Sequence, residues 1–333
     1  MNRIQKLRDK AKKQKKCVVL PEGEDKRVVE AAAIVTKENF AKVCLLGKKE
    51  SVEKLAKEVG VSLDGIDLID PATHDKKDEL INAFYEKRKH KGIAPEEAKE
   101  TLMKDLIFYG AMMTERGLAD GFVAGACHTT SNVARAGIQC LKIDREIGTM
   151  SSCFMMELDN CPFGEEGLFA FGDCGVIPYP NSRQLAGIAI ATSDMFKKLF
   201  DIEPRVGLLS YSTRGSAKGD SIENVRSALE RVIAKRPGLM VDGELQLDAA
   251  IVPDVAQRKC PDSKVQGRAN VLIFPNLDAG NISYKLTQRL GKARVVGPIL
   301  QGLDKPCSDL SRGCTLEEIV DAVAVIAIRA QKE

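Results

Sequence analysis

Residues 17–35 read CVVLPEGEDKRVVEAAAIV, and this stretch decides the fold class. The apolar run 17–20 predicts a short strand that ends at Pro21. An acidic turn follows, and the apolar spacing predicts a helix from about Asp25. A strand, a turn and a helix in succession are typical of an α/β protein. The run is uniformly apolar, as expected for a strand of a parallel sheet covered by helices on both faces.

The same pattern recurs on both sides of this stretch. We expect a Lys-rich helix over 2–16 with a solvated charged face, and one long helix from Pro95 to about Arg116. Further strands are predicted at 41–47, 66–70, 119–124, 205–212, 239–246 and 270–276, and further helices at 49–59, 76–89, 181–200, 221–235 and 281–293. Near residue 145 the chain becomes extended and rich in sulfur and aromatic side chains, which favours a domain boundary there. A chain of 333 residues exceeds the usual size of one core, so we expect two domains.

Composition excludes several classes of protein. The 50 basic and 47 acidic side chains nearly balance, so no strong field attracts nucleic acid. No apolar run reaches the roughly 18 residues of a membrane span, and the first residues lack the apolar core of a secretion signal. We therefore expect a cytoplasmic protein without membrane or nucleic-acid partners. Its ten cysteines form no C-x-x-C pair and are expected to be small buried residues, except Cys314, whose thiol pKa a helix start would lower.

Several catalytic motifs do not occur in the sequence. It has no G-x-G-x-x-G after a strand, no G-x-x-x-x-G-K-[ST] and no G-x-S-x-G. This argues against dinucleotide enzymes, P-loop enzymes and serine hydrolases. Of the three histidines, His74 and His90 are expected at the surface, and His128 is a candidate for a site.

The stretch GPILQGLDKPCSDLSRGCTLEE, residues 297–318, is the main candidate for chemistry. We expect the strand 294–296 to break at Gly297–Pro298, and a polar loop to lead into a helix at Thr315. A loop before a helix N-terminus offers backbone N–H groups and a positive dipole end, which suit an anion. The loop and first helical turn hold Ser308, Asp309, Ser311, Arg312 and Glu318, which supply an acid or base, hydroxyls and a cation.

Other glycine-containing polar loops follow predicted strands. They are the turn at 125–131, where Thr129, Thr130 and Ser131 either cap a helix or bind a ligand, and the loops that begin at Ser210, Asp242 and Pro275. In doubly wound sheets such loops converge at the carboxyl ends of the strands. Their hydroxyls, amides and cations suit phosphate binding and carbonyl polarisation without a metal or redox cofactor.

The motifs SYSTRGSA, DGELQLDAA, FPNLDAGNISYK and GPILQGLDKPCSDLSRGC, together with PEGEDKRVVEAA and AFYEKRKHKG, resemble those of the phosphate acetyltransferases. The resemblance runs from near residue 20 to the end. It implies reversible transfer of an acetyl group between coenzyme A and phosphate, part of acetate metabolism, with acetyl-CoA and acetyl phosphate as partners and no permanently bound cofactor. It also implies a homodimer and an isocitrate/isopropylmalate dehydrogenase-like fold. That fold has two three-layer α/β/α domains with mainly parallel sheets and a cleft between them, formed by residues 1–145 plus 300–333 and by 146–299.

The resemblance assigns roles to particular residues. The family's catalytic pair falls on Ser311 and Arg312, and its general base falls on Glu318. Arg88, Thr130 and Arg135 take substrate-binding positions, and which arginine binds phosphate and which binds coenzyme A stays open. Ser210, Asn281 and Tyr284, in motifs that carry the resemblance, are further substrate-binding candidates. Two departures matter: the base is an aspartate in the relatives compared and a glutamate here, and a turn that usually reads HSSSDTLRP reads HTTSNVARA.

Each catalytic candidate also has a structural interpretation. Thr315-Leu316-Glu317-Glu318 is a capping box, in which Glu318 bonds the backbone of Thr315 instead of a thiol. Ser311 is alternatively a turn hydroxyl, and Arg312 is alternatively one partner of a surface ion pair.

Three rival functions remain. A phosphate propionyl- or butyryltransferase differs only in the acyl chain, and a non-catalytic relative binds acyl-CoA without releasing coenzyme A. A dehydrogenase of similar layout requires an aspartate cluster for a metal and a nicotinamide loop, neither of which is found in the sequence.

Overall fold

The computed structural model describes residues 3–332, which form two compact units. The described part of unit 1 is residues 3–4 and 143–302, and that of unit 2 is residues 5–142 and 303–332. Helices alternate with mostly parallel strands in both units, so the predicted α/β class is confirmed. No helix within residues 3–332 is long and apolar enough to cross a membrane.

Unit 2 is built on a parallel sheet with the strand order β3-β2-β1-β4-β11. The strands are β1 (Cys17–Leu20), β2 (Lys42–Leu46), β3 (Ile66–Ile69), β4 (Gly121–Ala124) and β11 (Cys307–Asp309). The chain moves outward from β1 to β2 and β3, then returns to β4 on the other side of β1. The direction of winding therefore reverses between β1 and β4.

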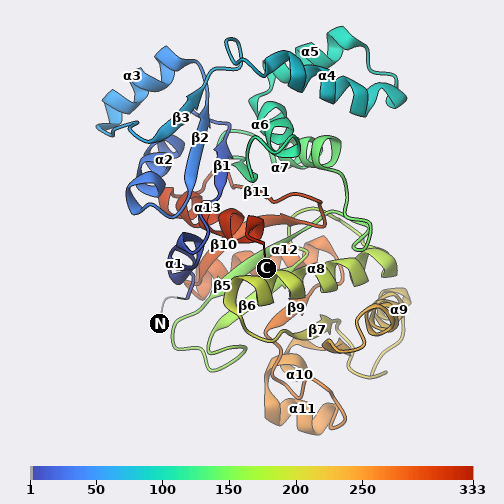
Figure 1. Cartoon of the computed structure of the whole chain (residues 1–333). Coiled ribbons are helices and arrows are strands. Elements are labelled where there is room, and N and C mark those ends of the chain that lie inside the picture. Colours follow the sequence, from blue (N-terminus) through green and yellow to red (C-terminus); the bar gives the residue numbers. More distant parts are fainter. Residues whose placement is uncertain (1–2, 333) are drawn as a thin grey trace. The chain divides into compact units, whose positions relative to one another are not determined.

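Helices cover both faces of this sheet (Figure 1). One face is packed by α2 (Lys26–Glu38) and α13 (Leu316–Ala330), with α3 (Lys49–Val59) against α2 and α1 (Lys6–Lys12) against α13. The other face is packed by α6 (Leu106–Glu115), with α4 (Lys77–Arg88), α5 (Pro95–Lys104) and α7 (Thr130–Ala136) around it. A 3-10 turn at Lys89–Lys91 and a π-helical turn at Gly137–Leu141 follow α4 and α7.

The last helix, α13, is a core element of unit 2. Every residue from Ile319 to Ile328 is buried, because α13 contacts the strands, α1 and α2 together. Buried Asp321 is neutralised by Arg8 of α1, whose Nε lies 3.0 Å from its Oδ1. Arg8 also pairs with Glu38 and Glu317. The prediction of a solvated charged face on the first helix was therefore wrong at Arg8, which holds α1 to two other helices.

Unit 1 carries a mixed sheet with the strand order β10-β5-β6-β9-β7-β8. The strands are β5 (Ser151–Glu157), β6 (Leu168–Gly172), β7 (Arg205–Leu209), β8 (Met240–Leu245), β9 (Val271–Ile273) and β10 (Arg294–Gln301). β5 is antiparallel to both of its neighbours, and the remaining pairs are parallel.

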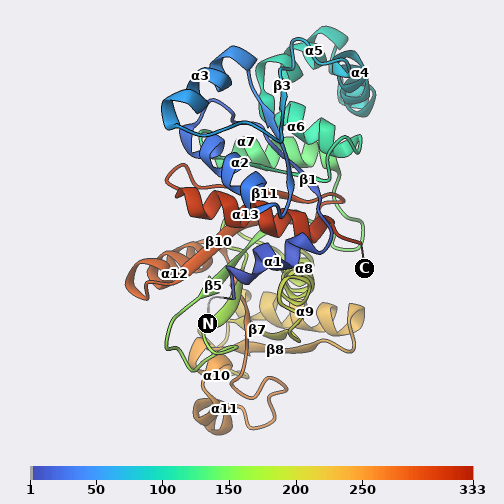
Figure 2. The same ribbon diagram turned by 60° about the vertical axis from the view of Figure 1, so that its left-hand side comes forward.

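Helices also cover the two faces of the unit 1 sheet (Figure 2). α8 (Ser182–Phe200) and α9 (Asp220–Lys235) pack against one face, and α10 (Leu247–Ile251) and α12 (Leu277–Leu290) contact strands of the sheet. The short helix α11 (Pro253–Lys259) packs against α10. An aromatic cluster in this core includes Phe154, Phe171 and Phe274.

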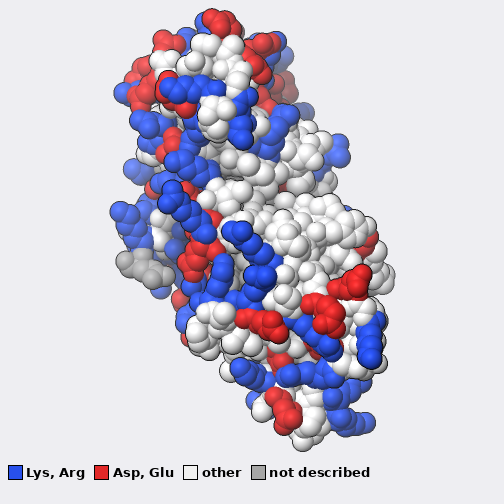
Figure 3. Space-filling model, turned by 90° about the vertical axis from the view of Figure 1, so that its right-hand side faces the viewer, with Lys and Arg blue, Asp and Glu red and all other residues white. Residues whose placement is uncertain are grey.

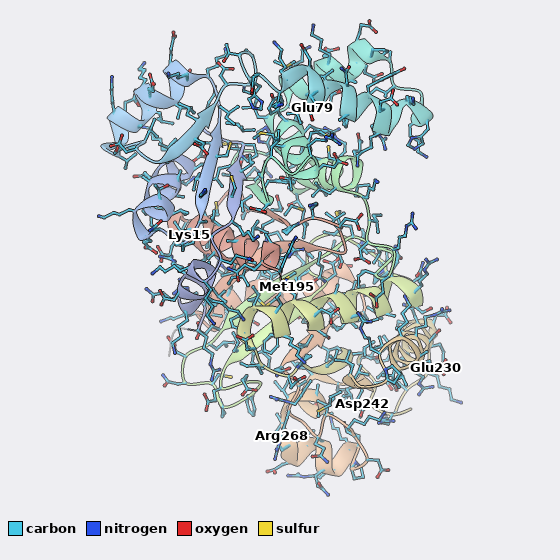
Figure 4. All side chains as sticks on the ribbon, viewed as in Figure 1. Lys15, Glu79, Met195, Glu230, Asp242 and Arg268 are labelled. Atoms are coloured by element: carbon cyan, nitrogen blue, oxygen red, sulfur yellow. The ribbon has the colours of Figure 1, made fainter. Side chains whose placement is uncertain are left out.

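Three local predictions were wrong. β10 does not break at Gly297–Pro298: it runs to Gln301, because β5 pairs with it on both sides of a bulge. The expected helix 95–116 is two helices, because the Asp105 carboxylate accepts a bond from the Ile107 backbone N–H and starts α6 anew. Asp242, labelled in Figure 4, does not begin a loop; it is buried within β8, in agreement with the predicted strand at 239–246.

The charge balance of the sequence is visible on the surface. On the face drawn in Figure 3, basic and acidic side chains are interspersed. No single sign dominates that view.

Candidate functional site

The loops that follow β1, β4 and β11 lie at one edge of the unit 2 sheet, because parallel strands share the direction of their carboxyl ends. The reversal of winding between β1 and β4 falls at this edge. In doubly wound sheets, such a switch point is where ligands bind. Most of the predicted site residues belong to these loops or to the elements that follow them.

Glu22, in the loop after β1, shapes the loop after β4. Its carboxylate accepts bonds from the backbone N–H groups of Gly125, Ala126 and Cys127, each at 2.8 Å, and contacts His128 Nδ1 at 2.7 Å. The Glu22 side chain is only 3% exposed. A buried carboxylate with four partners fixes the course of the turn that leads into α7.

Replacing Glu22 with glutamine is expected to destabilise unit 2 by about 2–3 kcal/mol, because an amide NH2 group would face buried N–H donors that lose a charged acceptor. Urea unfolding monitored by circular dichroism measures the change. The matched control is Glu24→Gln, since Glu24 is exposed, with an expected effect within about 0.5 kcal/mol. Equal stability of the Glu22→Gln and Glu24→Gln variants would contradict the structural role of Glu22.

Arg27 connects the three loops. Its Nη1 donates to the backbone carbonyls of Arg312 (3.0 Å) and Cys314 (2.9 Å), and its Nη2 donates to the carbonyl of Ala126 (2.9 Å). Asp25 pairs with the same guanidinium at 2.7 Å. One side chain from the start of α2 therefore holds the backbone on both sides of the predicted site.

The predicted catalytic pair lies in a tight turn after β11. Cys314 N–H donates to the Ser311 carbonyl at 2.8 Å, and Gly313 N–H donates to Ser311 Oγ at 3.2 Å. Ser311 and Arg312 are both exposed. The Ser311 oxygen thus acts as a turn acceptor, while its hydroxyl hydrogen remains able to donate to a substrate. Within residues 3–332, the Arg312 side chain forms no ion pair, so the surface ion pair considered for it is not present there.

Glu318 forms the predicted capping box at the start of α13. Its Oε2 accepts a bond from Thr315 N–H at 2.8 Å, and Thr315 Oγ1 accepts a bond from Glu318 N–H at 3.2 Å. The capping interpretation is therefore confirmed. A carboxylate has about four acceptor sites, so the cap does not use up its capacity to accept a proton.

Thr130 contacts the strand that leads to the predicted catalytic pair. Its Oγ1 donates to Asp309 Oδ2 at 2.5 Å, while the neighbouring Thr129 caps α7. Asp309 is fully buried at the end of β11. Burial raises the pKa of this carboxyl to about 7, and the nearby Glu22 charge acts in the same direction.

Arg88 and Arg135 line a single cavity of about 570 Å³ in unit 2. Its walls combine cations, aromatic rings and three carboxylates, and include Phe84, Arg88, Lys91, Glu97, Glu100, Lys104, Asp105, Phe108 and Arg135. The Arg135 guanidinium lies 5.5 Å from the centre of the Phe108 ring, and its Nη2 donates to Asn132 at 2.6 Å. α7 connects this cavity to the Thr130 turn, since Arg135 lies in the last turn of the helix that Thr130 begins.

The other three candidates lie in unit 1: Ser210 directly follows β7, and Asn281 and Tyr284 lie within α12, the helix after β9. Ser210 Oγ accepts a bond from Ser212 N–H at 3.2 Å. Asn281 Nδ2 donates to the carbonyl of Cys174 at 3.1 Å, and the Tyr284 ring stacks on Phe154 with centroids 4.2 Å apart. All three side chains have structural partners within unit 1.

Comparison with known proteins identifies the family of the chain. The model of the phosphate acetyl/butaryl transferase family matches residues 3–327. The chain belongs to this family.

Similar proteins are named phosphate acetyltransferase or phosphotransacetylase. The chain is 49% identical to a phosphate acetyltransferase of Thermoanaerobacterium thermosaccharolyticum, over 99% of this chain and 100% of the relative. It is 46% identical to a phosphate acetyltransferase of Acetivibrio thermocellus, over 99% of each chain. The crystal structure of a phosphotransacetylase from Streptococcus pyogenes superposes with a TM-score of 0.92 at 40% identity, over 99% of this chain and 98% of that one. The predicted membership and enzyme class, a transferase, are confirmed.

For this member of the phosphate acetyltransferase family, sequence reasoning missed Glu22 and Arg27 as organisers of the site. Both occur in the quoted motif PEGEDKRVVEAA, directly after a buried strand. Charged residues directly after a buried strand indicate a polar role at the end of that strand, and this signal was available in the sequence. Their partners, up to 287 residues away along the chain, were not predictable from spacing.

Two predictions about single side chains were wrong. The Cys314 thiol is buried, which raises its pKa to about 11 instead of lowering it. His74 is not a free surface residue, because its Nδ1 lies 2.7 Å from the buried Tyr109 hydroxyl. His90 is exposed as expected, and His128 contacts Glu22.

Proposed function

We propose that this chain catalyses the reversible transfer of an acetyl group between coenzyme A and inorganic phosphate, with acetyl phosphate as the other acyl carrier. The observation that carries the proposal is the family match over residues 3–327, together with full-length relatives named phosphate acetyltransferase. Acyl transfer of this kind needs a base, a hydroxyl and a cation, all of which the unit 2 loops contain. The reaction therefore requires no resident cofactor.

The proposed mechanism is a direct attack in a ternary complex. Glu318 takes the proton of the coenzyme A thiol, and the thiolate attacks the carbonyl carbon of acetyl phosphate. The tetrahedral intermediate then expels phosphate as the carbon–oxygen bond breaks, and acetyl-CoA remains. The exposed guanidinium of Arg312 stabilises the phosphoryl oxygens or the oxyanion, and Ser311 donates to the carbonyl oxygen. The turn at Thr130 orients the acyl group.

The cavity lined by Arg88 and Arg135 is the proposed site for the nucleotide end of coenzyme A. Guanidinium groups suit phosphate, and the ring of Phe108 offers an aromatic face beside them. The reacting groups, by contrast, lie in the loops after β4 and β11. This division assigns both arginines to coenzyme A instead of to inorganic phosphate.

The Arg88→Gln and Arg135→Gln variants are each expected to raise the KM for coenzyme A by roughly tenfold, the effect of one lost charged hydrogen bond, with little change in the KM for acetyl phosphate. Steady-state kinetics with coenzyme A and with 3′-dephospho-coenzyme A measure the change. If the replaced arginine binds the 3′-phosphate, the variant and the wild type should have the same KM for 3′-dephospho-coenzyme A. A raised KM for acetyl phosphate alone would instead assign that arginine to the phosphate site.

The function is tested with purified protein by phosphate-dependent release of coenzyme A from acetyl-CoA, repeated with arsenate. No release with either anion would overturn the proposal and leave the non-catalytic acyl-CoA-binding alternative. The family description also covers butyryl transfer. A series of acetyl-, propionyl- and butyryl-CoA in the same assay decides the preferred chain length.

We also propose a homodimer, and the cytoplasm as its location, where acyl-CoA is made and used. Support for the dimer comes from α12, which carries exposed apolar side chains four residues apart: Ile282 (58%), Leu286 (51%) and Leu290 (78%). Figure 2 draws α12 at the margin of unit 1. A stripe of this kind can pair with its own copy about a twofold axis. Light scattering on the intact protein tests the dimer, and a monomer mass would overturn it.

A further inference from the structure

Asp309 occupies a position that the catalytic scheme above does not use. It ends β11, two residues before Ser311, and its side chain is fully buried. Thr130 Oγ1 bonds its Oδ2 at 2.5 Å, while its Oδ1 is buried and accepts no hydrogen bond of good geometry within residues 3–332, its nearest donor being the Leu310 backbone N–H. Burying a carboxylate with one oxygen unpaired is costly, so a structural role alone explains this residue poorly.

Thr130 sits between this buried acid and the site. Thr130 is only partly buried, and it begins the helix that leads to the Arg135 cavity. A hydroxyl has one hydrogen. If Asp309 is ionised, that hydrogen bonds the carboxylate, and Thr130 presents only lone pairs to a substrate. If Asp309 is protonated, it donates to Thr130 Oγ1, and the hydroxyl hydrogen can point outward.

The loop geometry keeps the two groups together. Asp309 is paired in register with Ala124 of β4, and a Cβ at the adjoining Gly125 would come within 2.3 Å of Asp309 Oδ1. Gly125 has a φ of +113°, and Glu22 binds its N–H. The acid and the hydroxyl therefore keep their contact without depending on a substrate.

We propose that Asp309 is a positioning residue that sets the direction of the Thr130 hydroxyl. In its protonated form it turns the hydroxyl toward a substrate oxygen. This rests on the proposed function, because the substrate oxygens are those of the acyl phosphate.

Asp309 changes its protonation state near neutral pH. Burial raises its pKa to about 7, against the lowering effect of the hydrogen bonds from Thr130 and the Leu310 backbone, and the charge of Glu22, which is bonded to His128, adds to the rise. α13 contributes Arg329, which donates to the Cys307 carbonyl on the same strand. β4 contributes no charged side chain, and α7 contributes Arg135, which is directed to Asn132 and Phe108. Deprotonation above pH 7 therefore withdraws the hydroxyl hydrogen from the substrate.

The test compares Asp309→Asn, Thr130→Val and Thr130→Ser with the wild type from pH 5.5 to 9. For the wild type we expect kcat/KM for acetyl phosphate to fall about tenfold through an apparent pKa near 7, the loss of one hydrogen bond to a charged oxygen. Asp309→Asn cannot ionise and its amide donates to Thr130, so its profile stays flat there. For Thr130→Val we expect a kcat/KM about tenfold below that of the wild type at low pH, and no transition near pH 7. Thr130→Ser keeps a hydroxyl and should restore both the rate and the transition. An unchanged transition in Asp309→Asn overturns the proposal.

A second measurement is independent of activity. The raised pKa means that the folded state binds a proton between about pH 4 and pH 7 that the unfolded state has released, so this group's contribution to stability is lost as pH rises through that window. Asp309→Asn should therefore gain stability relative to the wild type from pH 5 to pH 8 in urea unfolding. A pH-independent difference overturns the inference. If the wild type is inactive with every acyl donor, the proposed function fails, while this comparison still tests the ionisation of Asp309.

Discussion

Replacing Arg312 with alanine lowers turnover by an expected 10²–10³-fold, the usual effect of removing one group that stabilises developing negative charge. Arg312 is exposed, and its carbonyl, not its side chain, bonds Arg27. The turn should therefore survive the substitution, with a change in stability within about 0.5 kcal/mol. Steady-state kinetics of acetyl phosphate formation and thermal unfolding measure the two quantities.

Two further variants sharpen the experiment. Arg312→Lys keeps the charge but loses the planar fork, and we expect an intermediate loss of turnover. Arg258→Ala, an exposed arginine of α11 in unit 1, is the matched control and should keep wild-type rates. An unchanged rate together with lost stability in Arg312→Ala would make this residue structural.

Glu318→Gln separates thiol activation from helix capping. The amide oxygen can still accept the bond from Thr315 N–H, so most of the cap is kept, but the side chain no longer takes a proton. We expect turnover with coenzyme A to fall by about 10²–10⁴-fold, the contribution of a general base. The measurement is the pre-steady-state rate of acetyl-CoA formation from acetyl phosphate.

Thr315→Ala weakens the cap of this helix but leaves the proposed base, Glu318, in place. It removes the hydroxyl that accepts from Glu318 N–H and should cost about 1 kcal/mol of stability, with turnover kept within a few-fold. If Glu318→Gln behaves like Thr315→Ala, stable to within the cost of a cap and nearly as active as the wild type, the base must be sought elsewhere.

Local patterns in the sequence predicted what local physics determines. The capping box at Thr315 and Glu318 and the start of α2 at Asp25 were both predictable, because each depends on residues within one helical turn. The alternation of strands and helices was predictable for the same reason. The family motifs then assigned candidate roles to residues whose contacts no local pattern describes.

The failures share a different cause. β10 continues through Gly297 and Pro298 because β5, more than 100 residues earlier, pairs with it across the bulge. Arg8 is buried because Asp321, at the other end of the chain, neutralises it. The Cys314 thiol is shielded by tertiary packing, and burial outweighs its place beside a helix start. In each case a partner far away in the sequence decides the local outcome.

The buried position of α13 has a consequence for the order in which the protein is made. β11 and α13, from residues 307–330, pair with β4 and fill one face of the sheet that begins at residue 17. On the ribosome, unit 1 is complete once residue 302 has emerged, whereas unit 2 must wait for α13, which ends at Ala330. The half of the chain that is synthesised first is therefore the half that folds last, and its apolar face stays uncovered throughout synthesis.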